Sequence, residues 1–300
     1  MGKELGNRMN LPTPPAVQPL RIGKISYLNT LPMVFNLPLE QQLGIPVQWF
    51  EAPPTRLNNA MFNKELDVSL VSAAAFLQHQ TEWVLLPHIS ISSFAPVRSV
   101  LWVADTHGKP LSFAEALSQF ETFPVTADSA TSVLLLRCLA QLYTGKPLPT
   151  QQLKPYPAEE YRDYLGHYGN ALMIGDAALS FMEAGLRKSD CVFDLSQLWT
   201  DYHGGTLPFV FGVWVAQRTW AEANPAVLQR LVGALQYQVQ QNLQNPVQKQ
   251  ALLQHAYRLG YTATQQLDSY FSHSLSYQLT PQHQQAMQQF YHYLTEFNLL

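Results

Sequence analysis

The stretch RIGKISYLNTLP, residues 21–32, decides the fold of this chain. Its apolar first half, residues 21–27, predicts a buried strand, and the polar step Asn29-Thr30 ends that strand before a helix restarts at Pro32. Ligands of open α/β sheets bind just beyond the carboxyl ends of the strands. The amide and the hydroxyl of this step stand at such an end, so we expect a ligand to contact Asn29 and Thr30.

The composition favours a globular protein that binds neither nucleic acid nor membrane. The 300 residues are 47% hydrophobic and 13% charged, which is enough for the cores of two domains or of one large domain. A net charge of −3 with 18 scattered Lys and Arg residues gives no basic stripe for nucleic acid. No window approaches the roughly 18 uninterrupted apolar residues of a membrane span.

The amino-terminal residues and the cysteines indicate a cytoplasmic location. Residues 1–20 contain four prolines and no apolar run typical of a signal peptide, so we expect a disordered leader. The two cysteines, Cys138 and Cys191, show no framework spacing. We interpret them as reduced core residues of a cytoplasmic protein whose oligomeric state the sequence leaves open.

Short apolar strands alternate with short helices between residues 21 and 215, which is the pattern of an α/β protein. The expected strands are residues 21–27, 47–50, 68–71, 84–90, 100–104, 123–127, 171–174, 191–194 and 209–216. The expected helices between them are residues 55–64, 73–78, 113–120, 130–142 and 176–184. After residue 218 only helices are expected, and three of them begin at Asn224-Pro225, Asn245-Pro246 and Thr280-Pro281, where a capping side chain precedes proline.

Two long apolar strands, 100–104 and 209–216, are the best candidates for crossovers between two lobes. We therefore expect a discontinuous first lobe of residues 21–102 plus 210–300 and a second lobe of residues 103–209. This arrangement resembles the type II periplasmic-binding-protein fold, in which a ligand lies in the cleft between the lobes. The resemblance implies a two-lobed α/β fold with a helical carboxy-terminal segment, and it carries no chemistry by itself.

Small polar residues follow several of the expected strands and begin helices. Free backbone N–H groups at a helix start, together with hydroxyls, can bind an anion without lysine or arginine. For each single residue, ordinary helix capping explains the pattern as well, and Asp176 is as suitable for an N-cap as for catalysis. The candidate substrate-binding residues are Thr30, Ser72, Ser129, Thr131, Ser132, Gly175 and Asp176.

The common catalytic motifs are missing from the sequence. It contains no H-E-x-x-H, no paired C-x-x-C, no G-x-S-x-G, no P-loop and no G-x-G-x-x-G. Its nine histidines are dispersed. A zinc site, a serine hydrolase and a nucleotide-dependent enzyme are therefore disfavoured, and no metal ligands are predicted. Residue pattern alone predicts a two-lobed α/β protein that binds a small anion.

Six ordered blocks of the chain resemble the chorismate dehydratase family of the futalosine route to menaquinone. They are RIGKISYLNTLP at 21–32, ELDVSLVSAAAF at 65–76, VRSVLW at 97–102, SATSVLLL at 129–136, LMIGDAAL at 172–179 and TLPFVFGVWVAQR at 206–218. The resemblance implies a lyase that converts chorismate to 3-[(1-carboxyvinyl)oxy]benzoate and water without metal or organic cofactor. It also implies that Asn29 and Ser99 engage the substrate most directly.

Two departures from the family pattern bear on the site. Residues 94–97 read Phe-Ala-Pro-Val where many relatives have glycine, so Ala95 would be strained if its φ were positive. Gly204-Gly205 is the second departure. Two alternatives to the dehydratase stay open: a small-anion-binding protein of the same fold, and the later enzyme of the route, which cleaves cyclic dehypoxanthinyl futalosine.

Overall fold

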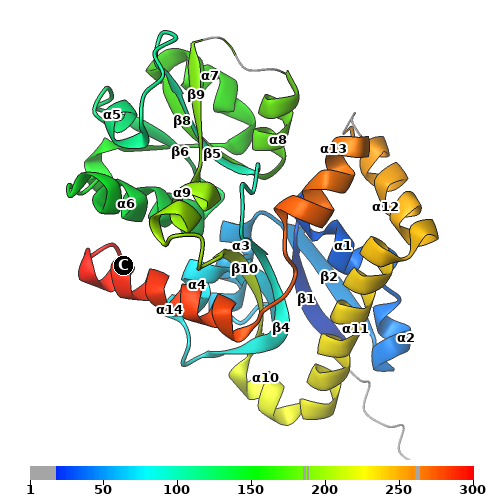
Figure 1. Cartoon of the computed structure of the whole chain (residues 1–300). Coiled ribbons are helices and arrows are strands. Elements are labelled where there is room, and N and C mark those ends of the chain that lie inside the picture. The colour runs from blue at the N-terminus through cyan, green and yellow to red at the C-terminus, as the bar shows by residue number, and fades with distance from the viewer. Residues whose placement is uncertain (1–17, 185–186, 188, 261–263) are drawn as a thin grey trace, which may run out of the picture.

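Two five-stranded sheets, each with its own helices, form the two lobes of the molecule (Figure 1). The computed structural model describes residues 18–184, 187, 189–260 and 264–300. Nearly all of the expected leader, residues 1–20, lies outside the described residues, and the first strand already begins at Leu20.

The first sheet has the order β2-β1-β3-β10-β4. Strand β1 pairs in parallel with β2 and β3, whereas β10 is antiparallel to β3 and β4. Every residue of β3 is buried because this strand lies in the middle of the sheet and is covered on both faces. The bounds are β1 (Leu20–Ile25), β2 (Val47–Ala52), β3 (Val68–Ser72), β4 (Trp83–Ser93) and β10 (Phe209–Gln217).

The second sheet has the order β7-β6-β8-β5-β9 and repeats this plan. Strand β6 is parallel to β7 and β8, and β5 is antiparallel to β8 and β9. The bounds are β5 (Val100–Asp105), β6 (Phe123–Thr126), β7 (Leu153–Tyr156), β8 (Asn170–Ile174) and β9 (Asp190–Asp194). The chain therefore passes from the first sheet to the second between Ser93 and Val100. It returns to the first sheet between Asp194 and Phe209.

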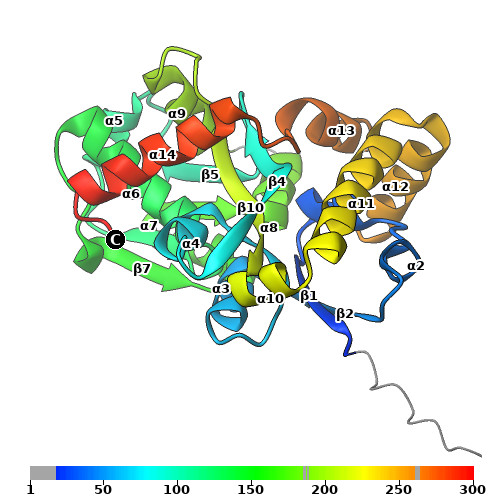
Figure 2. The same ribbon diagram turned by 90° about the horizontal axis from the view of Figure 1, so that it is seen from below.

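Helices cover the faces of both sheets and form one flank of the first lobe (Figures 1 and 2). In the first lobe and the carboxy-terminal segment they are α1 (Leu31–Val34), α2 (Leu39–Leu43), α3 (Pro54–Phe62), α4 (Ala73–Gln78), α10 (Arg218–Ala223), α11 (Pro225–Gln244), α12 (Pro246–Arg258), α13 (Thr264–Ser269) and α14 (Pro281–Glu296). In the second lobe they are α5 (Phe113–Leu117), α6 (Ala130–Thr144), α7 (Tyr161–Tyr168), α8 (Gly175–Ala184) and α9 (Leu195–Tyr202). Helix α14 packs on β10 and α4 and also touches α6, so it joins the two lobes. No helix of the described ranges is long and apolar enough to cross a membrane.

The three proline-marked helices α11, α12 and α14 begin where the sequence predicts. The side chain of Asn245 caps α12, and Thr280 caps α14 through a capping box. The predicted cap of α11 is wrong, because the Asn224 amide donates instead to the carbonyl of Trp220. At α11 the proline alone marks the start of the helix, since its φ suits the first helical position.

One glycine of β1 is required by packing. A Cβ at Gly23 would lie 2.3 Å from the Ser69 hydroxyl and under 3 Å from side chains of Leu57 and Leu66. Helix α3 therefore packs closely onto β1 only because this residue has no side chain.

Candidate functional site

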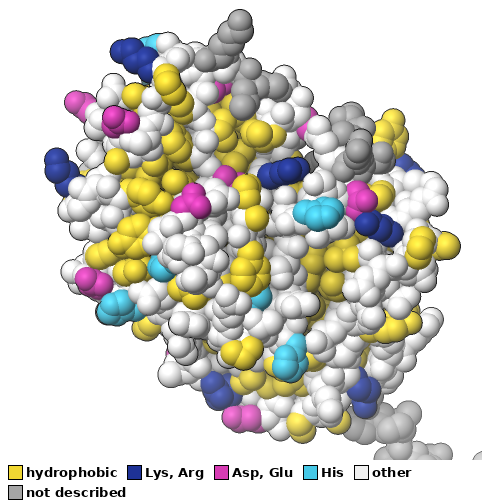
Figure 3. Space-filling model, viewed as in Figure 1, with side chains coloured by type: hydrophobic (Ala, Val, Ile, Leu, Met, Phe, Trp, Pro, Cys, Tyr) yellow, Lys and Arg dark blue, Asp and Glu magenta, His cyan; other side chains and the backbone are white. Residues whose placement is uncertain are grey.

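A cavity lies between the lobes, and residues of both sheets and of the connection between β4 and β5 line it. None of the described side chains that line it is charged. On the outer face shown in Figure 3, Lys and Arg side chains lie far apart from one another, so no basic patch gathers there. The lining residues are Ile25, Tyr27, Asn29, Pro54, Ser72, Ile91, Val97, Ser99, Val100, Ser129, Ser132, Ile174, Gly175, Phe211, Gly212 and Leu275.

Asn29 and Ser99 both line this cavity. Asn29 lies in the 3-10 turn after β1, where the Tyr277 hydroxyl donates to its backbone carbonyl at 3.0 Å. Its side-chain Oδ1 is buried without a hydrogen-bond partner among the described residues. A buried amide with an unused acceptor is costly unless a ligand or water completes it, so a hydrogen-bond donor of a ligand would satisfy Asn29 Oδ1.

Ser99 lies in the connection between β4 and β5, directly before the first residue of β5. Its carbonyl accepts from the Gly175 N–H at 2.7 Å, and its hydroxyl accepts from Tyr270 at 2.9 Å. The preceding Arg98 has a φ of +63°, and its N–H donates to the half-buried Asp194 carboxylate at 2.6 Å. Burial raises the pKa of Asp194 above its usual value, while hydrogen bonds from backbone N–H groups oppose that shift.

Ser72, Ser129 and Ser132 also line the cavity, and two of them are helix caps as well. The Ser72 hydroxyl accepts from the Ala75 N–H and begins α4. The Ser129 hydroxyl accepts from the Ser132 N–H at 3.1 Å and begins α6. The capping interpretation and the lining of a cavity are therefore compatible, because the helix starts themselves point at the cavity.

The other three polar candidates lie outside the lining and make internal hydrogen bonds. The Thr30 hydroxyl donates to the carbonyl groups of Ile25 and Tyr27 and closes the turn after β1. Thr131 and Asp176 instead connect the lobes: the Thr131 hydroxyl accepts from the Ala74 N–H at 2.9 Å, and Asp176 accepts from the Leu28 N–H at 3.1 Å.

Gly175 lines the cavity and packs directly against Tyr27 of the other lobe. A Cβ at Gly175 would lie 3.0 Å from two atoms of the Tyr27 ring, and the φ of this glycine is +55°. Both facts require glycine, since positive φ is strained for other residues. Burial first, and then the neighbouring carboxylates of Asp128 and Asp176, raise the pKa of Tyr27 well above its usual value, so the phenol stays neutral.

The sequence does not mark the aromatic residues of the site. Tyr27 and Phe211 line the cavity, and the hydroxyls of Tyr270 and Tyr277 donate to Ser99 and to the Asn29 carbonyl. Tyr270 and Tyr277 are more than 170 residues away from their partners in sequence. Among these aromatic residues, only Tyr27 could be linked to the site from the sequence, because it lies two residues before Asn29 in the stretch 21–32.

The two departures in the sequence have a simple structural outcome. Ala95 does not have a positive φ, whereas Arg98, three residues later, does. The anticipated strain at alanine is therefore absent, and the Arg98 N–H bond to Asp194 stabilises the unusual conformation instead. Gly204 and Gly205 do adopt positive φ angles, at the end of α9.

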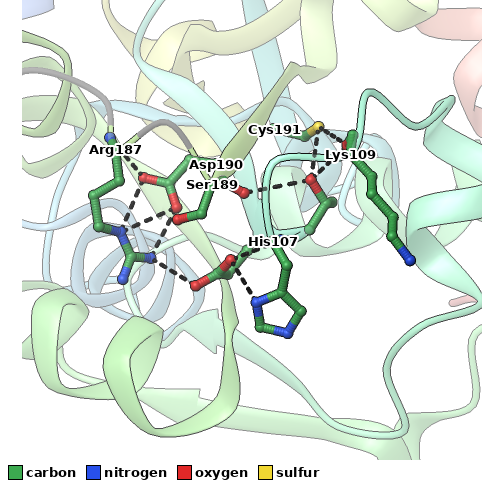
Figure 4. A network of polar contacts seen from close by, with 8 residues as sticks. His107, Lys109, Arg187, Ser189, Asp190 and Cys191 are labelled. Carbon is green, nitrogen blue, oxygen red and sulfur yellow. Dashed lines mark hydrogen bonds and ion pairs between the residues drawn. The ribbon is translucent and has the colours of Figure 1, made fainter.

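Neither cysteine contributes to the cavity. Cys138 is buried in the core of the second lobe, and burial raises the pKa of its thiol to about 12. Cys191 belongs to a polar network at the outer end of β9, where its Sγ lies 3.3 Å from the Thr106 hydroxyl (Figure 4). In the same network Arg187 forms an ion pair with Asp190 at 2.8 Å.

With this geometry established, comparison with known proteins decides the family. Residues 20–296 match the model of a family described as menaquinone biosynthesis. The chain belongs to the menaquinone biosynthesis family. A relative, the chorismate dehydratase of Thermus thermophilus, is 31% identical over 215 residues, which is 67% of this chain and 71% of that protein.

Solved structures support the fold of this family member. The alkanesulfonate-binding protein SsuA of Xanthomonas axonopodis pv. citri has a TM-score of 0.69 at 17% identity, covering 95% of this chain and 94% of its own. The SsuA of Escherichia coli has a TM-score of 0.65 at 16% identity, covering 94% and 88%. A protein of Archaeoglobus fulgidus gives 0.68 at 14% identity, covering 93% and 98%. The predicted periplasmic-binding-protein-like fold is confirmed.

Proposed function

We propose that this member of the family is a chorismate dehydratase, a carbon–oxygen lyase that forms 3-[(1-carboxyvinyl)oxy]benzoate and water. The observation that carries the proposal is the uncharged cavity between the lobes, with Asn29 and Ser99 in its wall and an unused amide oxygen on Asn29. The 31% identity to the Thermus thermophilus enzyme of that name supports the same reaction.

The site suits a ligand with two carboxylates even though its lining has no cation. Helix α6 of fifteen residues and helix α8 of ten residues both begin in the cavity wall, at Ser129 and Gly175. Their first N–H groups and the positive ends of their dipoles attract anions. We propose that one carboxylate of chorismate lies at these helix starts in the second lobe, together with the hydroxyls of Ser129 and Ser132, and that the other lies at the Ser72 hydroxyl in the first lobe.

The reaction requires charge stabilisation more than strong acids or bases. When the C3–H bond breaks, its electron pair moves through the ring double bond toward the ring carboxylate. The C4–O bond then breaks, and the ring becomes aromatic as hydroxide leaves. Preorganised neutral donors in a water-poor cavity stabilise such developing charge, and we propose that Asn29 and Ser99 supply them.

The proton from C3 needs an acceptor that the wall does not provide. None of the described lining side chains is a carboxylate or a histidine. We propose that the enolpyruvyl carboxylate of the substrate takes this proton, which later joins the departing hydroxide to give water. A complex with a substrate analogue that places a protein carboxylate or histidine within about 3 Å of C3 would overturn this assignment. We also propose that the reaction uses no metal and no organic cofactor.

The proposed function is tested by incubating the purified protein with chorismate and following the mixture by mass spectrometry. The expected result is loss of one water from chorismate with growth of the aromatic product. Binding of chorismate without change would favour a binding protein. A parallel incubation contains cyclic dehypoxanthinyl futalosine. Turnover of this compound, and not of chorismate, would identify the protein as the later enzyme of the route.

A further inference from the structure

One carboxy-terminal segment, residues 270–277, reaches back to Asn29 and Ser99 in the cavity wall. It begins with the π-helical turn Tyr270–Ser274, a rare conformation that is frequent at functional sites. Leu275 lines the cavity, and Ser276 exchanges two backbone hydrogen bonds with Ser92 of β4, at 2.9 and 2.7 Å. The segment is therefore fixed to the first sheet and can hold a side chain in one place.

The Tyr270 hydroxyl lies 2.9 Å from the Ser99 hydroxyl, and both side chains are about 2% exposed. A hydroxyl has one hydrogen to donate and can accept two. Phenols are the stronger acids of the two, with a pKa near 10, so the hydrogen between the two oxygens belongs to tyrosine. Among the described residues, this is the one hydrogen bond recorded for each of the two hydroxyls.

We propose that Tyr270 is a positioning residue that occupies one lone pair of Ser99 and turns the serine hydrogen into the cavity. Ser99 then acts as a donor toward the substrate and not as an acceptor. The inference rests on the proposed function, because it assigns a direction to the hydroxyl that the dehydration uses.

The surroundings of Tyr270 keep its hydrogen in place. Burial first raises the pKa of the phenol, and the charges of Asp176 and Asp194 add to that effect, while the bond to Ser99 opposes it. The phenol therefore remains protonated across the physiological range and always donates. The Gly175 N–H holds the backbone of Ser99 through its carbonyl, and Tyr270 holds the side-chain hydroxyl.

The first test compares Tyr270→Phe with wild type in chorismate turnover. The variant keeps the buried ring and removes the hydroxyl, so we expect kcat to fall by about 10- to 100-fold with KM nearly unchanged. In a Ser99→Ala background the same change should have almost no further effect. Additive losses, or a loss confined to KM, would overturn the inference.

A matched control separates positioning from stability. Tyr156 is also a buried tyrosine, and its hydroxyl donates to the Leu172 carbonyl at 2.7 Å, within the second lobe. Tyr156→Phe removes an equivalent hydrogen bond outside the cavity lining, so we expect a comparable loss of stability with kcat unchanged. An equal loss of kcat in both variants would show that Tyr270 acts only on folding.

The second test does not depend on the substrate. In Ser99→Cys, the Tyr270 hydroxyl would donate to the new sulfur and stabilise the thiolate, so its pKa should rise when Tyr270→Phe is added. Ultraviolet titration of the thiolate, with the wild-type signal of Cys138 and Cys191 subtracted, measures this shift. An unchanged thiol pKa would refute the inference even if chorismate turnover were normal. A wild type that leaves chorismate intact would instead refute the proposed function, while the titration would still decide the role of Tyr270.

Discussion

Substitution of Gly175 by alanine separates lobe closure from folding, because its new methyl group meets the opposite lobe. The added Cβ would lie 3.0 Å from Cγ and Cδ2 of the Tyr27 ring, whereas relaxed carbon contacts are about 3.5–4.0 Å. Overpacking of this kind costs about 1–3 kcal/mol. Since Tyr27 and Gly175 belong to different lobes, the strain is relieved when the lobes move apart.

The expected magnitude follows from that relief. A cost of about 1–3 kcal/mol carried by the closed form alone lowers its population, and with it kcat/KM, by about 5- to 150-fold. Alanine at this position also has to adopt a φ of +55°, which adds about 1 kcal/mol of strain to the folded chain. Chorismate turnover measures the first effect, and urea denaturation measures the second.

Gly145→Ala is the matched control for backbone strain. Gly145 ends α6 with a φ of +69°, and a Cβ there would meet no atom within 4 Å. We expect this control to lose about 1 kcal/mol of unfolding free energy with unchanged turnover. If Gly175→Ala behaved in the same way, the contact between Tyr27 and Gly175 would have no role in closure, and the reasoning would be wrong.

Three further predictions concern the connection between the lobes, the charge state and the cofactor. Thr131→Val leaves the Ala74 N–H without its acceptor in the closed form, so KM for chorismate should rise by about 5- to 10-fold, and an unchanged KM would count against this link. Burial raises the pKa of Asp194, so the folded chain holds a proton that the unfolded chain releases. The unfolding free energy of wild type should therefore fall relative to Asp194→Asn as pH rises from about 4 through the folded-state pKa, and parallel pH curves in urea denaturation would contradict this. Dialysis against a chelator should leave the rate of chorismate dehydration unchanged, whereas a loss restored by an added metal ion would refute the proposal of a metal-free reaction.

Local sequence pattern predicted most strands and the helices with strong start signals. The nine expected strands are all present, because each is a short apolar run bounded by polar or turn residues. Strand β7, Leu153–Tyr156, was missed, since its Lys154-Pro155 pair is unusual in a strand and is tolerated at this edge of the sheet. Helix α9 was also missed, although Asp194 followed by Gln197 is a recognisable start signal.

For the site, too, local sequence pattern predicts some residues, whereas others depend on contacts between distant parts of the chain. Asn29, Ser99, Ser72 and the serines that begin α6 could be predicted to face one cavity, because they follow strands or match family blocks. That Thr131 and Asp176 connect the two lobes depends on how the lobes meet, which no local pattern encodes. The contact of residues 270–277 with the cavity is equally non-local. The division into lobes at residues 102 and 210 stays a prediction. Strand β5, which spans the first of these boundaries, lies wholly in the second sheet.

The central claim is that Asn29 in this cavity supports the dehydration of chorismate. The most direct measurement is the initial rate of aromatic product formation from chorismate by wild type and by Asn29→Ala, with circular dichroism confirming that both are folded. The account predicts turnover by wild type and a rate about 10²- to 10³-fold lower for the variant, the usual loss for one preorganised donor. Intact chorismate with wild type, or equal rates for the two proteins, would contradict it.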